Sequence, residues 1–367
     1  QFYQFPLLFV SLEKRKFYLC KKNIQNVQFF DVVIIGAGPA GLKCAEKLGN
    51  SSLKVLLLEK NDEIGPKVCA GGLTGKGIEY LGLPPQLIEY SYNQVKLHVN
   101  NIASTLKSDT DFAFTIDRKK FGQWQLQKIK AFPNIEIRIS SKATVVNKDF
   151  IVVGGEKIGF KYLVGADGSN SIVKTFLGLK SRRKIIGIQY IISTNKYQDF
   201  EIFFQPEYFS AWYAWIFPHR SYISVGCGAD PKHVSPKKLK ENFHQWLNDR
   251  QIDISKGKYE AFPMDADYNG IRFDNIFLTG DAAGLVSPFT GEGIYQALIS
   301  GEETAKTILN PSYISDKMPA VIHKHKRHQQ LINLMIKSGR LKSLFFATGQ
   351  QLFKIPKYEK KAIELFG

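Results

Sequence analysis

The feature that most constrains this chain is a strand–turn–helix–strand pattern that begins at Asp31. Residues 31–35 form a short apolar run of the kind found in buried parallel strands. The sequence Gly-Ala-Gly-Pro-Ala-Gly fills 36–41, a helical stretch follows, and a second apolar run over 54–58 ends in Glu59. This order of strand, glycines, helix, strand and acid predicts an α/β fold with a Rossmann-type dinucleotide-binding unit.

Each part of this pattern has a mechanical reason. Gly36 permits the tight turn, Gly38 lets the backbone approach a pyrophosphate, and Gly41 allows the helix to pack closely on the strand. The N-terminus of the helix offers free N–H groups and the positive end of its dipole to that anion. Glu59 follows at the distance where a carboxylate accepts hydrogen bonds from the adenosine ribose.

Two later segments repeat the pattern of an apolar strand that ends in a Gly/Asp-rich turn. They cover residues 162–170 and 276–284, and the second contains Asp281. The sequence Pro-Phe-Thr-Gly-Glu-Gly-Ile over 288–294 then opens another helix. Ordinary strand-to-helix turns are the alternative explanation, but all three motifs occur in this order.

With these motifs, residues 31 to about 310 resemble the flavoprotein superfamily of the aromatic hydroxylases and geranylgeranyl reductases. The resemblance implies FAD as the cofactor. It implies that Asp281 binds the ribityl chain and that the backbone N–H groups of Gly293 and Ile294 approach the pyrimidine edge of the flavin. A helix N-terminus at that edge would stabilise the negative charge of the reduced flavin.

A cysteine-containing loop, Lys-Val-Cys-Ala-Gly-Gly-Leu-Thr over 67–74, resembles the loop that geranylgeranyl reductases place beside the isoalloxazine ring. The resemblance puts Cys69, Ala70 and Gly72 against FAD and makes Cys69 a candidate catalytic proton donor. The alternative is that Cys69 is a small buried apolar residue.

An aromatic strand is predicted near 211–217. Tyr213, Trp215 and Phe217 alternate along it and therefore share one face. The sequence Tyr-x-Trp-x-Phe-Pro resembles a signature of geranylgeranyl reductases, which implies that these side chains wall a tunnel for an isoprenoid chain. An aromatic core face of a second sheet is the alternative.

Two further cofactor contacts follow from the resemblance. Arg118 maps onto an FAD-contacting arginine at the start of a helix, and Ala143 maps onto a backbone contact near the adenine. His323, His325 and His328 lie in a Lys/Arg-rich stretch without carboxylate or cysteine partners at ligand-like spacing. We expect a solvated basic helix there and no metal site.

Composition limits the partners and the location of the chain. Its 367 residues carry a formal net charge of +17, which indicates either an anionic partner or a lysine-rich solvated surface. The charge alone leaves phospholipid, a pyrophosphate-bearing substrate and nucleic acid open as the anionic partner. The resemblance implies a lipid or small isoprenoid substrate and no nucleic acid. Four cysteines without paired spacing fit a reduced, cytoplasmic protein, and no apolar run reaches the length of a membrane span.

The C-terminal stretch over 331–366 mixes apolar clusters with Lys and Arg. It could lie on a membrane surface as an amphipathic helix, which would associate the protein with the inner face of a membrane, or it could pack on its own domain. The sequence alone leaves both open.

The predicted organisation has a Rossmann-type domain built from separate pieces, with a mixed β-sheet substrate domain inserted and helices at the C-terminus. The boundaries are 1–29 for an N-terminal extension, 30–180 for the FAD domain with part of the substrate side near 81–104, 181–264 for the substrate domain, 265–310 for the last FAD piece and 311–367 for the helices. Strands near 135–153 are expected to form a small β-meander.

The function implied by the resemblance is reduction of isoprenoid carbon–carbon double bonds by hydride from reduced FAD. No second G-x-G-x-x-G occurs, so NAD(P)H or another reductant would bind only transiently. Three alternatives remain: a flavin monooxygenase of the aromatic hydroxylase type, a non-redox cyclase or isomerase, and a flavin-binding interaction protein without turnover.

Overall fold

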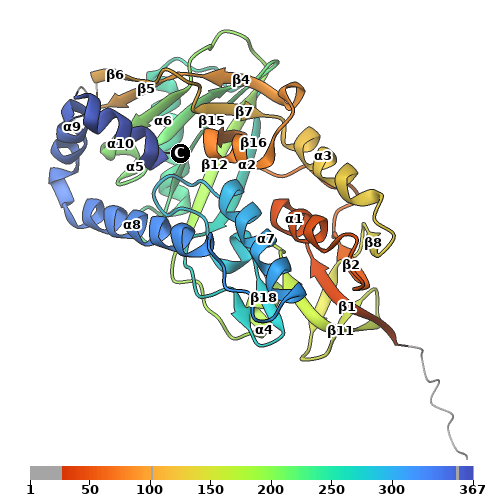
Figure 1. The fold of residues 1–367 in the computed structure, drawn as a ribbon. Coiled ribbons are helices and arrows are strands. Elements are labelled where there is room, and N and C mark those ends of the chain that lie inside the picture. The colour runs from red at the N-terminus through yellow and green to blue at the C-terminus, as the bar shows by residue number, and fades with distance from the viewer. Residues whose placement is uncertain (1–26, 101, 353–354, 367) are drawn as a thin grey trace, which may run out of the picture.

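The computed structural model describes residues 27–100, 102–352 and 355–366. Two large sheets dominate it, one in each half of an elongated molecule (Figure 1). The N-terminal segment 1–26 of the predicted extension lies outside the described residues. The first strand nevertheless begins at Gln28, three residues earlier than the sequence pattern predicts.

The first sheet has eight strands in the order β17-β18-β11-β1-β2-β8, with β10 and β9 attached to β11. Five of its strands run parallel: β1 (Gln28–Ile35), β2 (Val55–Leu58), β8 (Ile135–Arg138), β11 (Glu156–Gly165) and β18 (Ile276–Leu278). The antiparallel strands are β9 (Ala143–Val146), β10 (Phe150–Val153) and β17 (Arg272–Phe273).

Strand β1 shows why this sheet is buried on both sides. Val33 and Ile35 pack into one hydrophobic cluster and Val32 and Ile34 into another, because successive side chains of a strand point to opposite faces. Helices α1 (Pro39–Leu48) and α7 (Ile294–Leu309) pack against each other near this sheet. The predicted Rossmann-type α/β architecture is confirmed.

The second sheet has seven strands in the order β16-β12-β15-β14-β13-β5-β6. It draws on two distant parts of the chain, because β5 pairs in parallel with β13. The strands are β5 (Gln94–Val99), β6 (Ile102–Lys107), β12 (Lys184–Ile192), β13 (Glu201–Phe204), β14 (Ala214–Pro218), β15 (Ile223–Ala229) and β16 (Lys258–Asp265). Strand β14 begins later than predicted because a short helix and a turn at Ser210, with φ of 57°, come before it.

A third, three-stranded sheet has the order β3-β7-β4. Its strands are β3 (Gly72–Thr74), β4 (Ile88–Tyr92) and β7 (Ala113–Ile116), and β3 carries the end of the cysteine loop. The remaining elements are α2 (Gly75–Leu81), η1 (Pro85–Leu87), α3 (Arg118–Lys130), α4 (Ile172–Phe176), α5 (Pro206–Phe209), α6 (Pro236–Asp249) and η2 (Gly280–Ala283).

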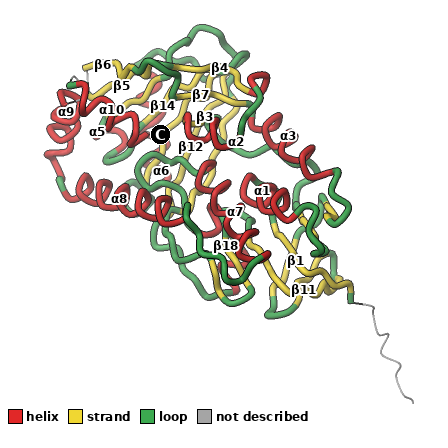
Figure 2. The backbone as a smooth tube through the Cα atoms, in the orientation of Figure 1, coloured by secondary structure: helices red, strands yellow, loops and turns green. Residues whose placement is uncertain are grey.

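The C-terminal region is helical and covers one end of the second sheet (Figure 2). It consists of α8 (Met318–Lys337), η3 (Gly339–Leu341), α9 (Lys342–Leu352) and α10 (Pro356–Phe366). Helix α9 packs on β5 and α10 on β6. No helix in the described part of the chain is long and apolar enough to cross a bilayer.

Two sequence-based expectations were wrong. The predicted meander over 135–153 holds only β9 and β10 with β11, because β8 pairs in parallel with β2 and extends the first sheet. Helix α8 is not a solvated basic helix throughout, because His325 and His328 are buried. Its apolar residues and these two histidines share the face that packs on the protein.

Candidate functional site

The turn between β1 and α1 is built around its three glycines. Gly36 has φ of 103°, and a Cβ there would collide with the backbone carbonyl of Ala166. A Cβ at Gly41 would collide with the carbonyl oxygen of Gly36, so this glycine sets the close approach of helix and turn. Gly38 has open space beside it and leaves the N-terminus of α1 without a side-chain cap. The first amides of α1 are therefore available to an anion.

This turn borders a cavity of about 400 Å³, which we call the glycine-loop cavity. Glu59 lies at its edge, where its carboxylate accepts hydrogen bonds from the backbone N–H groups of Ala37 and Asn61, both at 3.0 Å. The predicted cofactor residues that line it are Gly36, Gly38, Glu59, Arg118 and Ala143.

Three residues that line this cavity carry side-chain polar atoms that are buried without a hydrogen-bond partner among the described residues. These atoms are Nε of Arg118, Oδ1 of Asp167 and both amide atoms of Gln125. Burial raises the pKa of Asp167 above its ordinary value. Because an unpaired buried polar group is costly, these atoms indicate a polar ligand, and the glycine turn beside them fits a dinucleotide pyrophosphate.

Gln125 and Asp167 were not selected as site residues from the sequence. Gln125 lies seven residues after Arg118 on α3, which places both side chains on one face of the helix. That spacing could have identified Gln125. Asp167 lies in the Gly/Asp-rich turn of residues 162–170, which the sequence predicts, but its unpaired oxygen is visible only in the folded structure.

A second cavity, of about 180 Å³, is lined mostly by apolar and aromatic side chains, and we call it the aromatic cavity. The rings of Tyr213 and Trp215 lie 6.2 Å apart between centroids, and those of Trp215 and Phe217 lie 6.1 Å apart. Other lining residues are Val95, Leu106, Phe112, Phe200, Ile202, Phe262 and Met264.

The predicted flavin-side segments form the rest of the wall of the aromatic cavity. Cys69, Ala70 and Gly72 come from the cysteine loop, and Gly293 and Ile294 come from the start of α7. The structure thus brings the predicted flavin contacts and the three predicted substrate residues around one space.

Two predicted residues line neither cavity. Gly41 is buried behind the glycine turn. Asp281 lies in η2, where it forms an ion pair with Lys67 at 3.1 Å. Lys67 lines the glycine-loop cavity, and a Cβ on Gly293 of the aromatic cavity would lie 3.5 Å from Oδ1 of Asp281. Asp281 therefore lies between the two cavities.

Arg118 also connects the two cavities. Arg118 lines the glycine-loop cavity, and its Nη1 lies 3.9 Å from Sγ of Cys69. The same sulfur accepts a hydrogen bond of 3.4 Å from the backbone N–H of Gly71. The Cys69 thiol is thus held beside a cation at the junction of the cavities.

A chain of hydrogen bonds joins the aromatic wall to the cysteine loop. Nε1 of Trp215 donates to Oγ of Ser224 at 3.0 Å, and that hydroxyl donates to Oε1 of Gln189 at 3.0 Å. The amide of Gln189 donates to the carbonyl of Cys69 at 3.3 Å and to Glu260 at 2.9 Å. This buried network fixes the position of Trp215 relative to the loop.

His219, which directly follows β14, forms a second anchor for the cysteine loop. Its Nδ1 contacts the carboxylate of Glu89, and its Nε2 lies 3.0 Å from the carbonyl of Ala70. Each ring nitrogen of His219 thus faces an oxygen, one from β4 and one from the cysteine loop, so this side chain bridges the two segments. His219 was not predicted as a site residue from the sequence, although it adjoins the aromatic motif.

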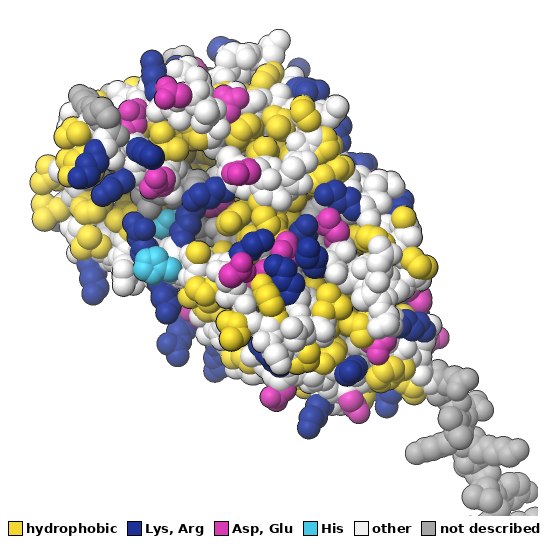
Figure 3. All heavy atoms as spheres, in the orientation of Figure 1, with side chains coloured by type: hydrophobic (Ala, Val, Ile, Leu, Met, Phe, Trp, Pro, Cys, Tyr) yellow, Lys and Arg dark blue, Asp and Glu magenta, His cyan; other side chains and the backbone are white. Residues whose placement is uncertain are grey.

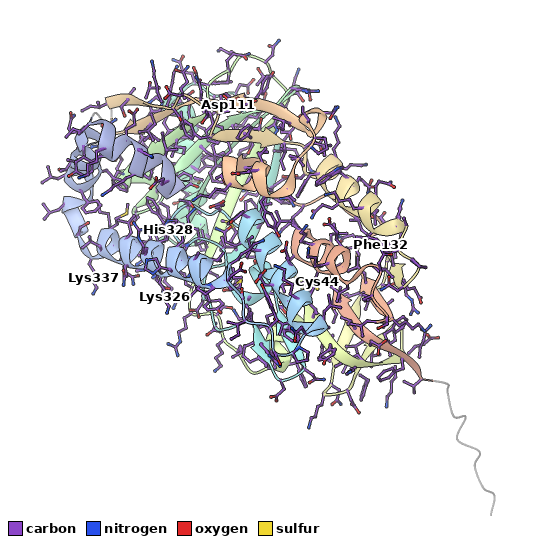
Figure 4. All side chains as sticks on the ribbon, in the orientation of Figure 1. Cys44, Asp111, Phe132, Lys326, His328 and Lys337 are labelled. Atoms are coloured by element: carbon purple, nitrogen blue, oxygen red, sulfur yellow. The ribbon has the colours of Figure 1, made fainter. Side chains whose placement is uncertain are left out.

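The segment from Ser287 to Gly293 ends at the aromatic cavity. Oγ of Ser287 accepts hydrogen bonds from the backbone N–H groups of Phe289 and Thr290, and it lies 2.7 Å from Nδ1 of His328. Burial, together with the positive charge of Lys324, His325 and Arg327, lowers the pKa of His328 to about 3. Neutral His328 accepts the hydroxyl hydrogen and anchors this segment; Figure 4 shows its place on α8.

One residue with a charged side chain, Glu292, lines the aromatic cavity, and its charge is balanced by an ion pair. Glu292 forms an ion pair with Lys324 at 3.2 Å and accepts a hydrogen bond from the hydroxyl of Thr74 at 3.2 Å. The hydroxyl of Tyr213 donates to the carbonyl of Thr290. Burial and, to a lesser extent, Glu292 raise the pKa of Tyr213, so its hydroxyl stays protonated.

Two family models match the chain. The pyridine nucleotide-disulphide oxidoreductase model matches residues 30–201, and the FAD binding domain model matches residues 141–299.

Two relatives and one solved structure are also similar to this chain. The digeranylgeranylglycerophospholipid reductase of Methanocaldococcus jannaschii is 30% identical over 306 residues, which cover 76% of this chain and 78% of the relative. The geranylgeranyl diphosphate reductase of Rhodobacter capsulatus is 25% identical, over 79% of this chain and 77% of the relative. A geranylgeranyl bacteriochlorophyll reductase-like structure from Thermoplasma acidophilum has a TM-score of 0.72 and 20% identity, and covers 92% of this chain and 100% of that one.

Proposed function

Since this chain belongs to the geranylgeranyl reductase family of FAD-dependent oxidoreductases, we propose that it reduces isolated carbon–carbon double bonds in an isoprenoid chain. The observation that carries the proposal is the aromatic cavity. It is apolar, it is lined by Tyr213, Trp215 and Phe217, and it shares the cysteine loop and the start of α7 with the predicted flavin site. An isoprenoid chain is apolar enough to enter such a space.

We propose that FAD lies across the junction of the two cavities. The glycine turn and Glu59 would hold its ADP part, and Arg118 and Asp281 would contact the part between the cavities. When bound, FAD supplies the hydride for the reaction. NAD(P)H or another reductant, bound transiently, is the proposed source of electrons for the flavin.

The protein's own part in the reaction follows from the character of the alkene. An unactivated double bond accepts a hydride poorly, so one carbon must gain a proton while the other gains the hydride. The aromatic faces of Tyr213 and Trp215 would stabilise positive charge that develops on the alkene. The apolar walls exclude water, which strengthens that interaction.

Cys69 is the proposed proton donor. Cys69 lines the aromatic cavity, and its sulfur lies 3.9 Å from Nη1 of Arg118. A thiol that gives up its proton there leaves a thiolate next to a guanidinium, and the opposite charges stabilise the product side of the transfer. Solvent would then restore the proton between turnovers.

Product analysis under two atmospheres tests the proposal. FAD-loaded protein, reduced with dithionite, is mixed with geranylgeranyl diphosphate without oxygen, and separately in the presence of ¹⁸O₂. We expect flavin reoxidation without oxygen and a product that gains two hydrogens per double bond. A product that carries ¹⁸O would instead assign the protein to the monooxygenases, and an unchanged substrate under both atmospheres would contradict the proposal.

A further inference from the structure

The C-terminal helices carry a concentration of exposed apolar side chains. Among the described residues, sixteen large hydrophobic side chains are exposed, and seven of them lie in the short stretch from Leu334 to Tyr358. They form what we call the C-terminal apolar face: Leu334, Leu341, Leu344, Phe345, Leu352, Ile355 and Tyr358. Exposed apolar residues that gather in this way mark an interaction surface.

This face is not the packing side of its helices. Ile332, Met335 and Phe346 are buried in the core of the second sheet, and the ring of Phe346 stacks on Phe204 at 4.8 Å. Leu341 and Leu344, by contrast, are 65% and 64% exposed. The helices thus have apolar residues on two sides, and the fold uses only the inner one.

The surroundings of the face are strongly basic. Residues 317–358 contain nine Lys and Arg residues and no Asp or Glu. Lys326, Arg327, Lys337 and Lys357 are exposed. In the space-filling view, hydrophobic side chains gather over α9 and the end of α8 with Lys and Arg beside them (Figure 3), and Figure 4 places Lys326 and Lys337 along α8.

We propose that the C-terminal apolar face docks the protein on the surface of an anionic phospholipid bilayer. Leucine and phenylalanine side chains would enter the boundary between headgroups and acyl chains, and the surrounding Lys and Arg would bind lipid phosphates. Either attraction alone is weak and reversible, while the two together hold a protein at the interface.

Charge complementarity favours a bilayer over a second copy of the chain. In a two-fold dimer the same patch lies on both subunits, so this face would meet an identical one. The exposed Lys326, Arg327, Lys337 and Lys357 would then oppose their own copies, and 317–358 contains no carboxylate that could pair with them across the interface. Like charges across an interface oppose association, whereas anionic headgroups neutralise them.

The face also lies close to the aromatic cavity. Phe346, on the inner side of α9, contacts Phe204, and the ring of Phe204 lies 5.7 Å from that of Tyr213 in the cavity wall. A protein docked through this face would hold the cavity near the acyl chains of the bilayer. Docking itself does not depend on the reaction proposed above.

Vesicle sedimentation of the full-length, FAD-loaded protein tests the proposal. The probes are vesicles of phosphatidylcholine alone and of equal parts phosphatidylcholine and phosphatidylglycerol. We expect binding to the anionic vesicles and weak binding to the neutral ones. The double variant Leu341→Ser, Leu344→Ser should lose at least tenfold in affinity, since it replaces two leucine side chains that would enter the bilayer with polar ones.

A matched control replaces two exposed apolar residues elsewhere. Ile314 lies before the start of α8, whose twenty residues span about 30 Å, and Ile139 follows β8 in the other half of the molecule. The variant Ile139→Ser, Ile314→Ser should bind anionic vesicles as the wild type does. An equal loss in both double variants would overturn the proposal.

Three other results would also overturn it: unchanged binding by the Leu341, Leu344 variant, equal binding to neutral and anionic vesicles, and a dimer in light scattering that the same variant converts to a monomer. Reduction of geranylgeranyl diphosphate without vesicles distinguishes this proposal from the proposed function. The variant should retain that reaction, and vesicle binding should survive even if the reaction is never observed.

Discussion

The glycine-loop cavity and the aromatic cavity adjoin each other but are built by opposite means. The first is formed largely by backbone turns at the carboxyl ends of parallel strands, and its unpaired buried atoms belong to Arg118, Gln125 and Asp167. The second is formed by side chains from both the second and third sheets, and its one charged lining residue, Glu292, is already paired with Lys324.

This difference indicates that the two cavities bind ligands of different polarity. A cavity with unsatisfied polar groups requires a polar ligand, whereas a cavity lined by paired polar groups and aromatic rings favours an apolar one. In this account the first cavity holds most of the cofactor, and the second holds the substrate chain. Substitutions in the two cavities should therefore affect different measured quantities.

The largest expected effect is loss of the cofactor, because protein without flavin has no flavin-dependent turnover at all. Asp281→Ala removes the carboxylate predicted to bind the ribityl chain, and a hydrogen bond to a charged group is worth roughly 1.5–3 kcal/mol. FAD affinity should fall about 10- to 100-fold, so the protein should lose most of its flavin on gel filtration. The ratio of flavin to protein absorbance measures this.

Asp253→Ala, which changes an exposed carboxylate in the loop before β16, serves as the control and should retain its flavin. Full FAD occupancy in Asp281→Ala would show that the junction of the cavities does not hold the ribityl chain.

The second effect concerns turnover with the flavin in place. Trp215→Ala removes a buried ring from the aromatic cavity and should cost a few kcal/mol of substrate or transition-state binding. Anaerobic reoxidation of reduced flavin by geranylgeranyl diphosphate should slow by roughly two orders of magnitude, at about 1.4 kcal/mol per decade. Stopped-flow absorbance measures this rate.

Photoreduction of the flavin needs no alkene and should be unchanged in Trp215→Ala. Trp215→Phe keeps an aromatic face and loses only the hydrogen bond to Ser224. Its rate of flavin reoxidation should therefore lie between those of the wild type and Trp215→Ala. Wild-type reoxidation in a folded, flavin-loaded Trp215→Ala protein would mean that this face is only core packing.

A smaller effect should follow from loosening the cysteine loop. His219→Gln cannot contact Glu89 and the Ala70 carbonyl through two ring nitrogens, and each hydrogen bond contributes about 1 kcal/mol. Reoxidation should slow about tenfold while flavin content stays the same. Glu89→Gln should disrupt the same contact. The increase in the activation free energy of reoxidation in the His219→Gln, Glu89→Gln double variant should therefore be smaller than the sum of the increases in the two single variants. Strict additivity would contradict a shared anchor.

The smallest effect at neutral pH involves the segment that His328 anchors. The pKa of His328 is lowered to about 3 in the folded protein, against about 6.5 in an unfolded chain. Below pH 6.5 the unfolded chain therefore binds a proton that the folded protein does not, and stability falls as the pH drops from 6.5 to 3. At pH 5 the loss should be about 2 kcal/mol in the free energy of unfolding.

Urea unfolding of wild type and His328→Gln at pH 7 and pH 5 checks this. The variant should be less stable at pH 7, because Ser287 loses its acceptor, but its stability should depend less on pH. Parallel pH dependence in the two proteins would exclude His328 as the titrating group.

The sequence predicted the parts of the molecule whose function depends on contiguous residues. The turn at Gly36, the strand that ends before Asp281 and the alternation of Tyr213, Trp215 and Phe217 are local patterns with local mechanical causes. Their assembly around adjoining cavities follows from the parallel sheet, since the carboxyl ends of its strands meet along one edge.

Features that depend on partners distant in the chain were not predictable. Strand β8 carries no signal of its pairing with β2, and the burial of His325 and His328 depends on which face of α8 meets the protein. The roles of Gln189 and His219 arise only when strands from different parts of the chain lie side by side. Burial and pairing are tertiary properties, and periodicity within one helix or strand does not determine them.

A crystal structure of the oxidised, FAD-loaded protein with geranylgeranyl diphosphate tests the central claim most directly. The oxidised flavin cannot deliver a hydride, so the substrate remains intact in the complex. The account predicts FAD across the junction of the two cavities and a double bond of the isoprenoid chain between the flavin and Trp215. An isoprenoid chain bound outside the aromatic cavity, or a flavin that fills it, would contradict the account.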